Sequence, residues 1–128
     1  MKTKVIIGIA LASVLAAGSA SAHHSFAAYE MQKSVTLEGI VKDFQWINPH
    51  SQILVEANGP GAKPGLWKIE ASSPAQMGRR GWKKSSVKLG DKISIVIHPM
   101  RTGEFGGSMV KTVINGKLVG DPNAPGNE

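Results

Sequence analysis

Residues 35–46 run Val35-Thr36-Leu37-Glu38-Gly39-Ile40-Val41-Lys42-Asp43-Phe44-Gln45-Trp46, and this stretch decides the fold prediction. Its apolar residues first occupy every second position, through Leu37 and Val41, which is typical of a half-buried β-strand. After Asp43 the apolar positions move to Phe44 and Trp46, in the opposite phase. The shift predicts one long strand with a bulge or bend, and Gly39 would ease its coiling.

The rest of the chain predicts further short strands and one helix. Alternating apolar residues indicate strands at residues 52–57, 66–71, 93–98, 108–114 and 117–119. Between the third and fourth strands, Ser73 is a suitable N-cap, Pro74 suits the first helical position and Gln76 would complete a capping box. Asn115-Gly116 indicates a type I′ hairpin, and residues 99–107 are expected to form a loop. We therefore predict an all-β domain with one short helix, a small OB-fold-like barrel of five to six strands, with a Greek-key sandwich lacking the helix as the alternative.

The first 22 residues have the composition of a secretory signal peptide. Lys2 and Lys4 precede an apolar run of about 13 residues, and Ala20 and Ala22 suit cleavage after Ala22. The run is shorter than the roughly 20 residues of a membrane-spanning helix, so we expect no transmembrane segment after processing. The predicted organisation is a signal peptide (1–22), an N-terminal leader (23–34), a barrel domain (35–119) and a disordered tail (120–128), in a periplasmic or secreted protein.

Charge and cysteine content limit the possible functions. The formal charge of +6 falls to +4 when the two signal-peptide lysines are removed. Nucleic acid would favour such a balance, but an exported protein rarely meets it, so we expect no nucleic-acid partner. A solvated basic surface, with some affinity for anionic lipid or polysaccharide, accounts for the charge. The absence of cysteine excludes disulfides and thiolate metal sites.

Several motifs together resemble those of a family of small exported bacterial proteins of unknown function. They are His23-His24-Ser25-Phe26, Leu37-Glu38-Gly39-Ile40-Val41, Trp46-Ile47-Asn48-Pro49-His50-Ser51, Trp67-Lys68-Ile69-Glu70, Arg80-Gly81-Trp82 and Gly90-Asp91-Lys92-Ile93. The likeness covers nearly the whole mature chain, and the two histidine motifs are its most specific parts. The resemblance implies an exported small β domain and supplies no activity.

The four histidines are the candidate metal ligands. Cleavage after Ala22 would leave His23 as the N-terminal residue, whose α-amine and ring Nδ1 can chelate one metal ion together. A nitrogen-rich tetragonal site of this kind favours Cu(II). His24 adjoins His23, His50 lies in a predicted turn, and His98 ends a predicted strand. Met100 and Met109 would suit Cu(I) as soft ligands, although methionine in a small domain more often fills the core.

Two other interpretations stay open. Without a metal, His50 would hydrogen-bond within its turn and His98 would face solvent. The protein would then be an interaction module for a periplasmic protein, a glycan or a peptide, with Trp46, Phe105, Lys42 and Arg101 as the binding residues. No residue pattern indicates a glycosidase pair, a catalytic triad or a phosphate-binding loop. We therefore predict a protein without enzymatic turnover, whose oligomeric state the sequence leaves open.

Overall fold

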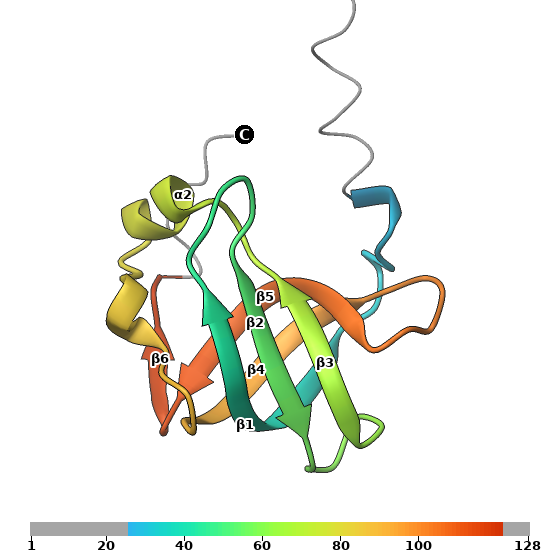
Figure 1. Cartoon of the computed structure of the whole chain (residues 1–128). Coiled ribbons are helices and arrows are strands. Elements are labelled where there is room, and N and C mark those ends of the chain that lie inside the picture. Colours follow the sequence, from blue (N-terminus) through green and yellow to red (C-terminus); the bar gives the residue numbers. More distant parts are fainter. Residues whose placement is uncertain (1–25, 122–128) are drawn as a thin grey trace, which may run out of the picture.

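The computed structural model describes residues 26–121. Its strands are β1 (Val35–Gln45), β2 (Gln52–Ala57), β3 (Gly65–Glu70), β4 (Lys92–Pro99), β5 (Gly106–Ile114) and β6 (Lys117–Val119). The helix α2 (Pro74–Arg79) and the short 3₁₀ helix η1 (Lys84–Ser86) connect β3 to β4 (Figure 1). The predicted signal peptide, His23, His24 and residues 122–128 of the predicted tail lie outside the described residues.

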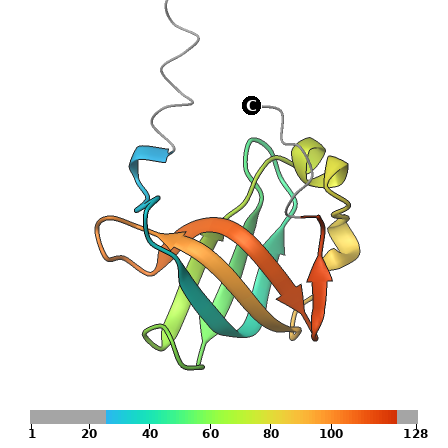
Figure 2. The same ribbon diagram turned by 180° about the vertical axis from the view of Figure 1, so that it is seen from behind.

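Five of the strands close into a barrel. The sheet order is β3-β2-β1-β4-β5-β6, and a parallel pairing of β3 with β5 closes the first five strands. Figures 1 and 2 show β1 curving around the barrel between β2 and β4, to both of which it is hydrogen-bonded. This strand order, with the helix between β3 and β4, is the OB fold. The predicted fold class is confirmed, and the sandwich alternative is wrong.

The bend of β1 lies where the sequence predicted it. Its register against β2 shifts by one residue between Val41 and Asp43. Leu37 and Val41, before the shift, are buried in the core, and Phe44, after it, packs against the core at one end. The Phe44 ring lies 5.8 Å from that of Trp46 and 6.5 Å from that of Trp82. One strand can therefore serve both halves of the barrel because the bulge reverses its phase.

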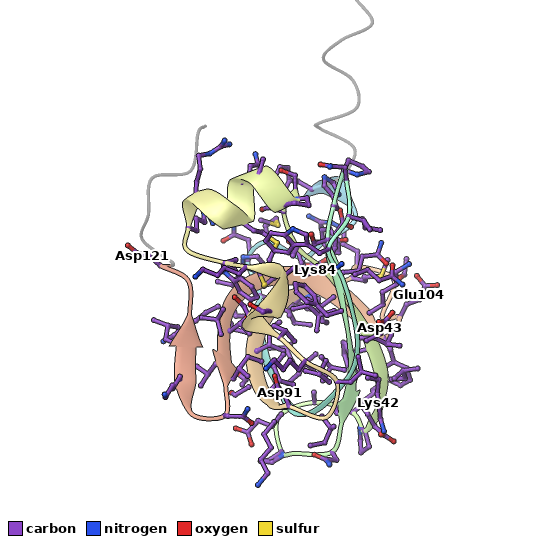
Figure 3. The ribbon with its side chains drawn as sticks, turned by 60° about the vertical axis from the view of Figure 1, so that its left-hand side comes forward. Lys42, Asp43, Lys84, Asp91, Glu104 and Asp121 are labelled. Atoms are coloured by element: carbon purple, nitrogen blue, oxygen red, sulfur yellow. The ribbon has the colours of Figure 1, made fainter. Side chains whose placement is uncertain are left out.

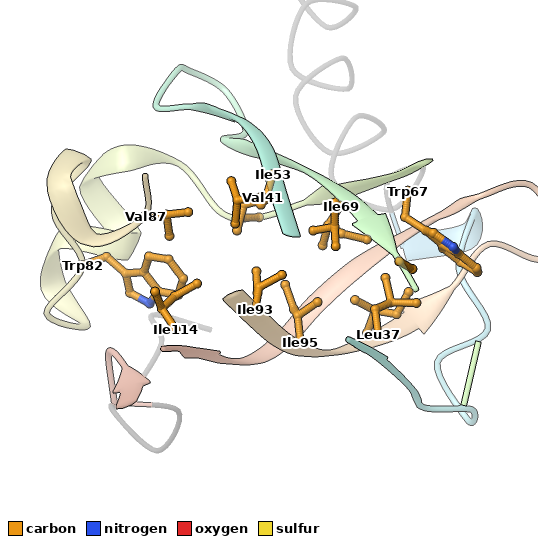
Figure 4. Close-up of a cluster of buried hydrophobic side chains, with 14 of the residues drawn as sticks. Leu37, Val41, Ile53, Trp67, Ile69, Trp82, Val87, Ile93, Ile95 and Ile114 are labelled. Carbon is orange, nitrogen blue, oxygen red and sulfur yellow. The ribbon is translucent and has the colours of Figure 1, made fainter. Parts of the chain in front are cut away.

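The core consists of inward-facing residues from every strand of the barrel and from the connection between β3 and β4. Figure 4 shows Ile93 and Ile95 of β4 facing Val41, Ile53 and Ile69, which come from β1, β2 and β3. Trp67 lies at one end of this cluster and Trp82 at the other. Trp82 is buried at its end of the barrel. Aliphatic burial of this kind stabilises a domain that has no disulfide.

The helix α2 lies over the end of the barrel at which Trp82 is buried. Ser73 is its N-cap and accepts a hydrogen bond from the backbone N–H of Gln76 at 3.3 Å, which is the Ser73 half of the predicted capping box. Pro74 occupies the start of the helix, and Met77 is buried in the core. The local sequence therefore determines where α2 begins.

Replacement of Ser73 by alanine should lower the free energy of unfolding by about 1 kcal/mol, because the amide of Gln76 loses its cap. Urea unfolding followed by tryptophan fluorescence measures the difference. Ser85→Ala in η1 is the matched control, since Ser85 is exposed, and should change stability by less than about 0.5 kcal/mol. Equal effects of the two substitutions would contradict the capping role.

Two turns differ in how well they were predicted. Asn115 and Gly116 both have positive φ, 49° and 82°, as the predicted type I′ hairpin between β5 and β6 requires. The loop predicted to end at Gly107 is shorter than expected, because β5 begins at Gly106. Gly106 and Gly107 pair with Lys68 and Ile69 of β3 and so take part in barrel closure.

Within residues 26–121, no helix is long and apolar enough to span a membrane.

Candidate functional site

A pocket of about 270 Å³ opens between the segment before β1, the β1–β2 loop, the start of α2 and β5. Its lining combines aromatic, thioether, imidazole, carboxylate and hydroxyl groups. The lining residues are Phe26, Tyr29, His50, Glu70, Ala71, Ser72, Gln76, Ser108 and Met109. The pocket is the candidate site because it unites residues from distant parts of the chain around one carboxylate.

Glu70 is the central residue of this pocket. It ends β3, where its Cα lies opposite Gln52 of β2 and Ser108 of β5. One carboxylate oxygen, Oε2, accepts a hydrogen bond from the Tyr29 hydroxyl, and the other, Oε1, pairs with Nδ1 of His50. The Glu70 side chain is 30% exposed and that of His50 is 40% exposed, so the pair is partly accessible from solvent.

The contact with Glu70 determines what His50 can bind. A carboxylate beside Nδ1 favours the tautomer with its proton on that nitrogen. In the neutral ring, Nε2 then carries the free lone pair. Histidine ligands of metals commonly have this arrangement, with the second nitrogen donating to a carboxylate. His50 is therefore oriented as a potential nitrogen donor.

Tyr29 supports the carboxylate from the other side. The side chain is only 7% exposed. Burial, followed by the hydrogen bond to Glu70 and the negative charge of that residue, raises the pKa of the Tyr29 hydroxyl. Tyr29 therefore remains a neutral donor at physiological pH and keeps Glu70 in place.

The segment from Phe26 to Lys33, which precedes β1, is held against the loop that follows β4. Tyr29 forms a β-bridge with Met100, and Glu30 N–H donates to the carbonyl of Pro99 at 2.8 Å. Arg101 donates through its backbone N–H to Ala28 O and through Nε to Ala27 O, and forms an ion pair with Glu30. This network brings Phe26, three residues after His23, to the pocket.

Comparison with known proteins gives a family but no activity. The sequence profile of the family of unknown function DUF6152 matches residues 10–109, most of the chain. The chain belongs to this family. No curated protein matches it. A solved structure of the mitochondrial single-stranded DNA binding protein Rim1 from S. cerevisiae is similar at 8% identity and a TM-score of 0.48, over 66% of this chain and 95% of that one.

The structure describes two of the four candidate histidines of this DUF6152 member, and it places them differently. His50 lies in the pocket, and His23 and His24 lie outside the described residues. His98 is held by a contact between its Nδ1 and the carbonyl of Lys33 at 2.6 Å. Its Cα lies opposite Ser108, which in turn lies opposite Glu70, so about 10 Å separates the backbones of His98 and Glu70. Within residues 26–121, no group of three or more His, Asp or Glu side chains lies close enough together to hold a metal ion.

The four residues of the alternative binding set have separate contacts. Trp46 lies half-buried against Phe44, and Lys42 forms an ion pair with Glu56 at 2.6 Å. Phe105 packs on Trp67 with ring centroids 5.2 Å apart, toward the start of β3. Arg101 holds the segment before β1, as described above. These side chains do not share one set of contacts, in contrast to Tyr29, His50 and Glu70.

Sequence reasoning missed Tyr29 and Glu70 as parts of the site. In the sequence, Glu70 lies in the predicted strand 66–71 and Tyr29 in the predicted leader, and neither position stands out as part of a site. The available signal was the fold itself: in an OB barrel the end of β3 lies beside the β1–β2 loop. Once that fold is assumed, Glu70 and His50 are expected to be neighbours.

Proposed function

We propose that this DUF6152 protein is exported and binds copper through its mature N-terminus and His50, for storage, delivery or sensing and without catalytic turnover. The observation that carries the proposal is the Glu70–His50 pair, in a pocket whose lining includes Phe26. Cleavage after Ala22 would place the new N-terminus three residues from Phe26. An extended segment of that length spans about 10 Å, which allows the terminus to reach the pocket.

The proposed ligand set consists of three nitrogens. The α-amine and Nδ1 of His23 would form a chelate, and Nε2 of His50 would be the third donor, with His24 as a further imidazole. An α-amine has a pKa of about 7.7–8 and loses its proton readily on metal binding. Nitrogen donors in a tetragonal arrangement suit Cu(II). The protein would act in the periplasm or outside the cell, where a signal peptide would direct it.

The first experiment tests His50. Replacement by alanine should weaken Cu(II) binding to the mature protein more than about tenfold, since loss of an outer-shell partner alone costs 10–100-fold. His98→Ala is the matched control and should leave the affinity within about twofold, because about 10 Å separates the backbone of His98 from that of Glu70, the partner of His50. Competition titration gives the affinity, and EPR of the Cu(II) form should show one fewer nitrogen donor in His50→Ala.

The starting material needs one check, and two results would overturn the proposal. Intact mass of protein isolated from the periplasm must correspond to a chain beginning at His23. Another N-terminus, or unchanged affinity in both His23→Ala and His50→Ala, would contradict the copper site. In the alternative function, an interaction module without metal, Trp46→Ala would instead lower glycan or peptide affinity, and copper would have no effect on it.

A further inference from the structure

The excess positive charge of the chain is concentrated in one segment. Residues 79–92 contain six lysines and arginines and one aspartate, a net charge of +5. Residues 23–128 together carry +4, because Lys2 and Lys4 account for two of the total of +6. Residues 23–78 and 93–128 together therefore have a net charge of −1. The charge of the mature chain is thus distributed asymmetrically along its sequence.

This segment covers one side of the barrel. It runs from the end of α2 through η1 to the start of β4, with β6 beside it (Figures 1 and 2). In Figure 3 this side comes forward, with Lys84 on η1 facing the viewer. The strands β5 and β6 add two exposed lysines, Lys111 and Lys117. We call this surface the basic face; it comprises Arg79, Arg80, Lys83, Lys84, Lys88, Leu89, Lys92, Val110, Lys111, Lys117 and Leu118.

Among residues 26–121, the ion pairs of Lys42, His50 and Arg101 involve no residue of this face. Asp121 lines the same hollow as Arg80 and Lys111, and the net charge of the face stays positive. The carboxylate of Asp91, which lies within the segment, accepts hydrogen bonds from Lys88 N–H and the Asn115 side chain and so serves the turn. The excess of lysine and arginine on this face can therefore attract an external anion.

Aliphatic side chains are exposed among these lysines. Leu89 is 70% exposed, Leu118 is 50% exposed and Val110 is 43% exposed. Each is the sequence neighbour of a lysine: Lys88, Lys117 and Lys111, respectively. Cationic groups surrounding aliphatic side chains match the interface of a bilayer, where phosphate groups border acyl chains.

The composition of the face favours a bilayer over a nucleic acid or a polysaccharide. Those polymers are commonly held by aromatic side chains that stack on bases or sugar rings. Trp82, the aromatic residue of this segment, is buried. The exposed rings of Phe26 and Phe105 belong to the segment before β1 and to the β4–β5 loop, on the other side of the molecule (Figure 1).

We propose that the basic face binds peripherally to membranes that contain anionic phospholipid, with Leu89 and Leu118 entering the headgroup region. The proposal is independent of copper binding, because the pocket with His50 lies outside this face.

Vesicle flotation tests the proposal with the full mature chain. We expect binding to phosphatidylcholine vesicles that contain phosphatidylglycerol, and none to pure phosphatidylcholine. Lys84→Glu combined with Lys88→Glu should lower the partition coefficient at least about tenfold. Lys63→Glu combined with Lys68→Glu is the matched control, with the same change in net charge at exposed positions on β3 and the loop before it, and should have an effect below about threefold.

A second variant separates a bilayer from a soluble polyanion. Leu89→Ser removes no charge and should weaken vesicle binding about threefold to tenfold, as expected for an inserted aliphatic side chain. It should leave binding to heparin or single-stranded DNA unchanged. Equal losses in both lysine pairs would show a diffuse charge effect, and unchanged vesicle binding in Leu89→Ser would show simple polyanion binding. Either result overturns the proposal; thermal unfolding confirms that each variant is folded.

Discussion

Replacement of Gly39 by alanine should lower the free energy of unfolding by about 3 kcal/mol or more, the largest stability effect that we expect from a single methyl group in this protein. An added Cβ would lie 2.0 Å from the carbonyl oxygen of Glu56 and 2.9 Å from Cα of Ala57. Both are backbone atoms of β2, so no side-chain rotation relieves the clash. Gly39 also pairs with Ile93 on its other side, and β1 cannot shift away without breaking that pairing.

Thermal or urea unfolding measures this effect. A loss of 3 kcal/mol corresponds to a decrease in Tm of more than about 12 °C for a domain of this size. Gly78→Ala is the matched control, because Gly78 is in α2 and, apart from its chain neighbours and the backbone of that helix, no atom lies within 4 Å of the added Cβ. The control should be neutral or stabilising by up to about 1 kcal/mol. A Gly39→Ala variant as stable as the control would show that the two strands separate more easily than their pairing indicates.

Removal of the α-amine of His23 should weaken Cu(II) binding at least about 100-fold, more than loss of an outer-shell group costs. Transamination of the mature chain converts this amine to a carbonyl and leaves both imidazoles and all lysines intact. The chelate proposed above needs the amine nitrogen together with Nδ1, so loss of the amine removes one donor and opens the chelate ring. Competition titration before and after the reaction measures the change.

Blocking the α-amine of His23 with a short N-terminal extension would not be a clean test, because the extension can create a new copper site. One or two added residues would make His24 or His23 the third residue, where amine, amide and imidazole nitrogens together bind Cu(II) strongly. The matched control is transamination of the His23→Ala variant, which already lacks the chelating ring and should lose less than about tenfold. Equal losses in the two proteins would contradict a chelate at His23.

The local features of the fold were predictable from short stretches of sequence. The phase change at Asp43 located the bulge of β1, Ser73 located the start of α2, and Asn115-Gly116 located a hairpin. Each depends on residues only a few positions apart. Alternation and capping act within that range, so the sequence displays them directly.

The pocket was only partly predictable. His50 and His98 were both candidate ligands, in a turn and at a strand end, whereas Tyr29 and Glu70 were not selected. The structure places the Tyr29–Glu70 contact across 41 residues of chain, and it gives His98 a different partner, the Lys33 carbonyl. No periodicity in the sequence encodes contacts of such separation.

The sequence by itself determined the strand pattern, the single short helix and the chemical types available for a site, because these follow from neighbouring residues and composition. Barrel closure through β3 and β5, and with it the arrangement of Tyr29 and His50 around Glu70, was decided by the tertiary structure alone. The physical reason is that closure brings the end of β3 against β5, next to the β1–β2 loop and the segment before β1. A carboxylate that is an ordinary strand residue in the sequence thereby becomes the centre of the pocket.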